Sequence, residues 1–222
     1  MDSTSFNYVL TQFGIVGLVL CVVLFALYRL GSDLAKLRTE LQQQVTRDLL
    51  NKRFDAYGRL WATMKPIAIY SDDVLSPSKV RSLGEALSGW YFSVDGGMFL
   101  TSRARDFYFA LQDTLEAAGE LKGWKCTHRP DDVKGKFKDL LSSFDNGAGL
   151  SPETLDHPEN IDPMEWRSVC RNIAARLKSL PTEGGVEVND TVFAAVQQIS
   201  SALRSILAFE LRTRLELNVP RL

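Results

Sequence analysis

The sequence predicts an all-α protein in three parts: an N-terminal transmembrane helix, a helical stalk and a cytoplasmic helical bundle of about five helices. Three observations lead to this fold class. Residues 8–28 contain no charged side chain, and residues 31–65 carry an apolar stripe at helical spacing without a proline. Residues 66–222 contain repeated helix start and stop signals but no series of alternating strands. We therefore expect a membrane anchor over residues 1–30, a stalk over 31–65 and a helical domain over 66–222.

The overall composition excludes several classes of protein. Hydrophobic residues make up 45% and charged residues 24% of the 222 residues, as in ordinary folded proteins. The three cysteines exclude a disulfide-rich scaffold. A net charge of −1 gives no reason to expect a nucleic-acid partner.

The N-terminal segment is long and apolar enough to cross a bilayer. Residues 8–28 read YVLTQFGIVGLVLCVVLFALY. At about 1.5 Å per residue they span roughly the 30 Å of a hydrocarbon core. A buried core helix and a cleaved signal peptide are the competing interpretations. The segment lacks the basic leading region and the cleavage site of a signal peptide, so we expect a retained anchor in contact with lipid.

The charges that flank this segment predict its orientation. No Lys or Arg precedes the span, whereas Arg29, Lys36 and Arg38 follow it. The positive-inside rule places the N-terminus outside and the rest of the chain in the cytoplasm. Cys126 and Cys170 show no disulfide framework, which fits a reducing compartment.

The stalk sequence predicts a helix with one narrow apolar face. Its apolar residues recur at steps of three or four, as on a coiled-coil seam. The candidates for self-association are Leu34, Leu37, Leu41 and Val45, together with the small residues Gly14 and Gly17 of the span. The alternative is that the stripe packs on the chain's own domain, which the aromatic residues after Leu49 favour for the second half.

Gly31 leaves two possibilities for the path of the chain. If it interrupts the first helix, Ser32 is a plausible cap for a second one. Otherwise one helix continues from the span to about Met64.

Caps and breakers divide the domain into five longer helices. We expect helices over about 77–93, 102–118, 131–144, 163–180 and 190–216, with one helical turn at 151–153. The clearest start signals are Ser76-Pro77, Thr101 and Asp162-Pro163. Residues 98–100 and 186–188 are candidates for short extended pieces.

No motif for catalysis, a metal or a cofactor is found. Cys126 and His128 stand two residues apart, but no CxxC or HxxxH pattern supplies further ligands. We expect these two residues and His157 to be exposed in loops. No Walker motif, GxSxG or Rossmann fingerprint occurs. We therefore expect no catalytic residue, no metal and no cofactor.

The most distinctive stretch is residues 90–111, which read WYFSVDGGMFLTSRARDFYFAL. The favoured interpretation is a helix–loop–helix corner, with glycines at backbone angles closed to other residues, aromatic side chains in the core and an Arg/Asp brace. The alternative is a pocket for an anionic or planar ligand, with Arg103 and Arg105 as charge partners. The candidate contacts are Trp90, Tyr91, Gly96, Gly97, Arg103, Arg105 and Asp106.

This stretch also carries a resemblance. A Trp-Tyr pair, a Gly-Gly pair with a hydrophobic run, and Thr101-x-x-x-Arg105-Asp106 before an aromatic helix resemble uncharacterised bacterial proteins with one N-terminal span. The likeness covers roughly residues 50–120. It implies a location in a bacterial inner membrane and identifies no active site.

These features favour a membrane-anchored, non-enzymatic interaction or scaffold protein. Its partner is a second copy of the chain or an unidentified cytoplasmic protein. Two other classes stay open: a membrane effector or sensor that oligomerises through span and stalk, and an enzyme with an unrecognised site.

Overall fold

The predicted all-α fold class is confirmed. The computed structural model describes residues 3–93, 96–144, 157–181 and 185–218, and within these ranges no strand is formed. The α-helices are α1 (Ser3–Thr63), α2 (Pro77–Ser93), α3 (Gly96–Phe99), α4 (Ser102–Glu120), α5 (Val133–Ser142), α6 (Pro163–Lys178) and α7 (Val186–Asn218). Two 3₁₀ turns, η1 (Lys65–Ile67) and η3 (Pro158–Asn160), accompany them.

The chain forms two compact units, residues 1–52 and residues 53–222. Helix α1 contributes to both, because it extends from Ser3 to Thr63, and it continues without interruption through Gly31. An interruption at Gly31, with Ser32 as a new cap, is therefore wrong. Glycine in a helix interior costs about 1 kcal/mol relative to alanine, which the many other residues of so long a helix outweigh.

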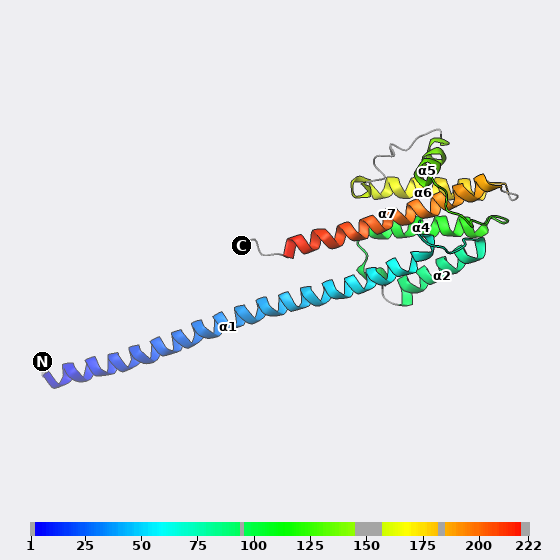
Figure 1. Ribbon diagram of the computed structural model, residues 1–222. Coiled ribbons are helices and arrows are strands. Elements are labelled where there is room, and N and C mark those ends of the chain that lie inside the picture. Colours follow the sequence, from blue (N-terminus) through cyan, green and yellow to red (C-terminus); the bar gives the residue numbers. More distant parts are fainter. Residues whose placement is uncertain (1–2, 94–95, 145–156, 182–184, 219–222) are drawn as a thin grey trace. The chain divides into compact units, whose positions relative to one another are not determined.

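Helix α4 is the central element of the second unit. It packs against α2, α6 and α7, and α5 packs against α7 (Figure 1). The core between these helices is rich in aromatic residues: the rings of Phe107 on α4 and Trp166 on α6 stack with their centroids 5.1 Å apart. The last turn of α1 and the residue that follows the helix belong to the same core, since Leu60 and Met64 are fully buried. Large apolar side chains thus stabilise the bundle by their removal from water.

At two of the helix starts that the sequence predicts, an N-cap side chain forms hydrogen bonds to the first turn. The Thr101 hydroxyl accepts a hydrogen bond from the Ala104 N–H at 3.1 Å. The Asp162 carboxylate accepts from the Met164 and Glu165 N–H groups at 2.8 and 3.0 Å. Each of these bonds satisfies an N–H that has no partner within its own helix.

Two short segments differ from the sequence-based expectation. Residues 98–99 belong to α3, and residues 186–188 form the first turn of α7, so neither segment is an extended piece. Alternating hydrophobicity over three residues does not separate a strand from a helix end. Helix α7 ends at Asn218, close to the end that the sequence predicts for its polar last turns. The helical turn expected at 151–153 lies outside the described residues.

Among the described residues, α7 is the one helix long and apolar enough to cross a membrane. Within Val186–Arg212, the most apolar window of 18 residues has a mean hydropathy of 1.3, and 67% of that window is buried inside the structure. Phe193, Val196 and Ile199 are fully covered by neighbouring helices. Such burial is typical of a core helix, so the apolar character of α7 is weak evidence for a span. The span expected at residues 8–28 stays a prediction.

Candidate functional site

The aromatic pair at the end of α2 packs into the core of the bundle. Trp90 is buried, and its indole N–H donates to the Ala56 carbonyl of α1 at 3.0 Å. Tyr91 is half-buried and stacks on Tyr108 of α4 with ring centroids 5.1 Å apart. Burial of both rings joins α2 to α1 and α4.

Gly96 and Gly97 are required by close packing against these two rings. A Cβ on Gly97 would lie 2.7 Å from the Tyr91 ring, and a Cβ on Gly96 would overlap the Trp90 indole. Neither glycine has a positive φ. Among the described glycines, a positive φ is found at Gly123, where it is 82°. The expectation of special backbone angles at these glycines is therefore wrong. The absence of a side chain is what matters.

The charged residues of the corner contact neighbouring elements and not one another. Arg103 is half-buried and donates from Nη2 to the Ile161 carbonyl at 3.0 Å. Asp106 accepts from Arg167 of α6 at 3.4 Å, and Arg167 also lies over the Phe109 ring at 5.4 Å. Arg105 is exposed, and within the described ranges its side chain makes no hydrogen bond or ion pair. Among the described residues, Arg103 and Arg105 therefore share no hydrogen-bond partner.

A buried carboxylate closes the corner from the side of α7. Glu210 is 8% exposed, and the hydroxyls of Tyr57 and Thr101 contact its two carboxylate oxygens. The Tyr57 hydroxyl also lies 3.0 Å from the Phe99 carbonyl. This network ties α1, α7 and the α3–α4 junction together. No prediction from the sequence includes this network, although Glu210 interrupts the apolar face of α7 and is a local signal for it.

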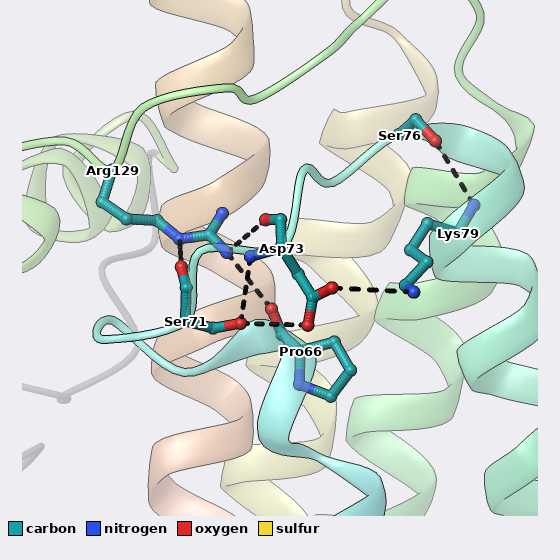
Figure 2. A network of polar contacts seen from close by, with 6 residues as sticks. All are labelled: Pro66, Ser71, Asp73, Ser76, Lys79 and Arg129. Carbon is teal, nitrogen blue, oxygen red and sulfur yellow. Dashed lines mark hydrogen bonds and ion pairs between the residues drawn. The ribbon is translucent and has the colours of Figure 1, made fainter.

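Arg129 holds the loop between η1 and α2. Its guanidinium donates to the carbonyls of Pro66, Ser71 and Asp73 at 3.2, 3.1 and 2.6 Å (Figure 2). The guanidinium carbon also lies 4.6 Å above the Phe193 ring of α7. Three converging carbonyls suit the fixed fork of an arginine. No local pattern singles out Arg129, because its partners stand up to 63 residues away.

The cysteine and histidine of the same loop do not form a reactive pair. Cys126 is 2% exposed and its thiol donates to the His128 carbonyl at 3.0 Å, so the expectation of an exposed Cys126 is wrong. Burial raises the pKa of the Cys126 thiol. His128 and His157 are exposed, and within the described chain no cluster of three metal-ligating side chains is found.

A cavity of about 430 Å³ lies between the start of α5 and the middle of α7. Its walls include Asp131 and Lys134 on one side and Gln197, Gln198 and Ser201 on the other. The Gln198 amide donates to the Gln197 side chain at 2.8 Å, so part of this polar wall is satisfied internally. None of these residues is a candidate from the sequence alone.

The apolar stripe of α1 differs from the corner because the structure leaves it uncovered. We use the name α1 stripe for Leu34, Leu37, Leu41, Val45 and Leu49. All five side chains are 53–62% exposed. A shallow groove along this face is lined by Leu34, Leu37, Arg38, Leu41, Gln42, Val45 and Thr46. Gly14 and Gly17 are exposed on the same helix, with open space around them.

Comparisons of the chain with family models, with curated proteins and with solved structures found no match. The corner uses most of its polar groups internally, whereas α1 presents apolar side chains without a cover.

Proposed function

We propose that the chain is a membrane-anchored interaction protein of a bacterial inner membrane. Residues 8–28 cross the bilayer, the N-terminus lies outside, and the helical domain works in the cytoplasm. The protein acts by holding a partner, or a second copy of itself, close to the membrane. No step of this function needs a catalytic residue, a metal or a cofactor.

The observation that carries the proposal is the exposure of the apolar side chains at the N-terminal end of α1. Between Val19 and Leu30 the large hydrophobic side chains are 49–77% exposed. Water does not tolerate so long an apolar surface on every side of a helix, whereas lipid does. Arg29 follows directly, where the positive-inside rule predicts a cation.

The contrast with α7 supports this choice of span. Helix α7 also contains a window apolar enough to cross a membrane, yet its large side chains fill the core of the bundle. Moving α7 into lipid would open that core and expose Phe193, Leu203 and Ile206. The side chains from Val19 to Tyr28 require no such rearrangement, because all of them are exposed.

The test is alkaline extraction of membranes that contain the full-length chain. The wild type is expected in the membrane pellet. The double variant Leu20→Arg/Leu24→Arg places two charges in the span, at a cost of about 2.5–3.5 kcal/mol each, and is expected in the supernatant. The matched control Thr39→Arg/Gln43→Arg adds the same charge at the same spacing outside the span and is expected in the pellet. Equal extraction of both variants would contradict the proposal.

The α1 stripe also favours a second candidate, a membrane effector or sensor that oligomerises through span and stalk. Such a protein perturbs the bilayer once its spans assemble. It predicts growth inhibition on overexpression that disappears when residues 1–30 are deleted. A scaffold leaves growth unaffected, so the same growth curves separate the two candidates.

A further inference from the structure

The charges beside the α1 stripe are sorted by sign. Successive residues of an α-helix are rotated by about 100° around its axis. Around the axis of α1, each of Asp33, Glu40 and Asp48 is rotated by about 70–80° to the same side, measured from the mean direction of the two nearest stripe residues. Arg38, Gln42 and Thr46 lie at a similar angle on the other side, and all three line the groove. We call these two rows the acidic flank and the Arg38 flank. The three residues of the acidic flank are all the carboxylates between Gly31 and Lys52.

None of these charges is used within the first unit. Asp33, Arg38, Glu40 and Asp48 are exposed, and the structure gives them no ion pair among the described residues. The hydroxyls of Thr39 and Thr46 instead bond to carbonyls four residues earlier on α1. The acidic flank and the Arg38 flank are therefore available to another helix.

From this arrangement we infer that the α1 stripe binds the same stripe of a second copy of the chain, with the two helices parallel. In a parallel pair the acidic flank of one helix faces the Arg38 flank of the other. Asp33 directly precedes the core residue Leu34, and Arg38 directly follows the core residue Leu37. In a parallel coiled coil, the residue at the position of Asp33 in one helix pairs with the residue at the position of Arg38 in the other. The two-fold symmetry forms this Asp33–Arg38 pair twice.

An antiparallel pair would bring like charges together. Its acidic flanks would face each other, with three carboxylates from each chain and no cation between them. An unrelated helix would not in general present both flanks with the complementary signs. The surface is thus self-complementary in one orientation only.

The spacing of the stripe also predicts the geometry of the pair. Leu34 and Val45 are eleven residues apart and enclose three apolar steps, a period of about 3.67 residues. An eleven-residue repeat favours a slight right-handed supercoil and not the left-handed one of heptads.

This inference deepens the proposed function by naming the partner, and its test does not need a membrane. The full-length chain with Cys21→Ser is studied in detergent, where nothing forces the two copies to point the same way. Cys126 and Cys170 are at most 2% exposed, so they stay unreactive while the fold is intact. If the membrane anchor is wrong, the cysteine cross-links between the two α1 helices are unaffected. If the parallel dimer is wrong, the alkaline extraction of the membranes is unaffected.

Single cysteines at Leu34→Cys and at Val45→Cys are oxidised separately and as a mixture. A parallel pair gives a disulfide dimer with each variant alone, because each residue meets its own copy. Cross-linking that appears only in the mixture of the two variants indicates an antiparallel pair and overturns the inference. No cross-link at all also overturns it. Gln43→Cys, on the opposite face of α1, is the matched control and gives no dimer.

Charge variants then test the flanks by the dissociation constant of the dimer from sedimentation. Arg38→Glu replaces two attractive contacts with two repulsive ones and weakens the dimer by about tenfold. Lys36→Glu makes the same charge change on the far face and leaves the constant unchanged. The exchange Asp33→Arg/Arg38→Asp restores wild-type affinity. Equal effects of Arg38→Glu and Lys36→Glu, or no rescue by the exchange, overturn the pairing of flanks.

Discussion

Substituting alanine for Gly97 tests whether the 90–111 corner is a structural brace. The new Cβ would lie 2.7 Å from two carbon atoms of the Tyr91 ring, whereas unstrained contacts exceed 3.0 Å. The ring has little freedom to move away, because it stacks on Tyr108 at 5.1 Å and packs on Phe109 at 5.5 Å. Either the ring leaves its position or α3 lifts from the bundle.

The expected cost follows from this overlap. Overpacking a well-filled site costs about 1–3 kcal/mol, so we take about 2 kcal/mol for Gly97→Ala. For a domain of this size that lowers the Tm by about 4–8 °C. Gly89 lies in α2 with nothing within 4 Å of its would-be Cβ. Gly89→Ala therefore gains helix propensity, about 0.5–1 kcal/mol, and raises the Tm by about 1–4 °C.

Thermal denaturation followed by circular dichroism measures both variants in the same detergent. Opposite signs for Gly97→Ala and Gly89→Ala are the predicted result. If Gly97→Ala is as stable as the wild type, the corner is loosely packed. The need for glycine at positions 96 and 97 would then come from contact with a ligand or a partner and not from packing against the two rings.

The remaining predictions concern polar groups that the bundle uses internally. Arg129→Lys keeps the charge but loses the fork to three carbonyls, so urea denaturation should show a loss of about 1–3 kcal/mol. Arg105→Ala removes an exposed cation and should change stability by less than about 0.5 kcal/mol; a larger loss would reveal a contact that the fold does not show. Tyr57→Phe takes a hydroxyl from buried Glu210 and should cost about 1–3 kcal/mol, measured in the same way. Burial raises the pKa of Tyr108 from 10.0 to about 12. The protonated phenol therefore contributes stability that is complete below pH 10 and is lost as the pH rises through about 12. Tyr108→Phe should remove this alkaline step from a plot of unfolding free energy against pH, and an unchanged step would assign it to another group.

Local signals predicted most of the helices. Thr101 and Asp162 stand where caps were expected, because a cap depends on residues within one turn of the helix. The apolar spacing of α4 and α6 likewise marks the faces that the structure buries, as Phe107 and Trp166 show. Such features need no knowledge of the rest of the chain.

The details of the site depend on contacts between distant residues. Glu210 lies 153 residues from Tyr57 and 109 from Thr101, so neither contact can be read from spacing. The role of Gly97 likewise could not be predicted, because it depends on a contact with a ring and not on the local sequence. A glycine that avoids a ring six residues earlier has the same sequence as a glycine that adopts a positive φ.

The charge sorting beside the α1 stripe is the opposite case. It depends only on the helical period and on residues within a short segment, so the sequence alone is enough to predict it. The structure adds that α1 is helical through this segment and that the stripe side chains are uncovered. The stalk was therefore easier to interpret than the corner, although the corner has the more distinctive sequence.

The most direct test of the account is the accessibility of two introduced cysteines in spheroplasts. In a Cys21→Ser background, Ser3→Cys lies before the span, and Lys138→Cys lies on an exposed position of α5. A membrane-impermeant maleimide should label Ser3→Cys in intact spheroplasts and Lys138→Cys only after lysis. Labelling of Lys138→Cys in intact spheroplasts would contradict a membrane anchor that holds the helical domain in the cytoplasm.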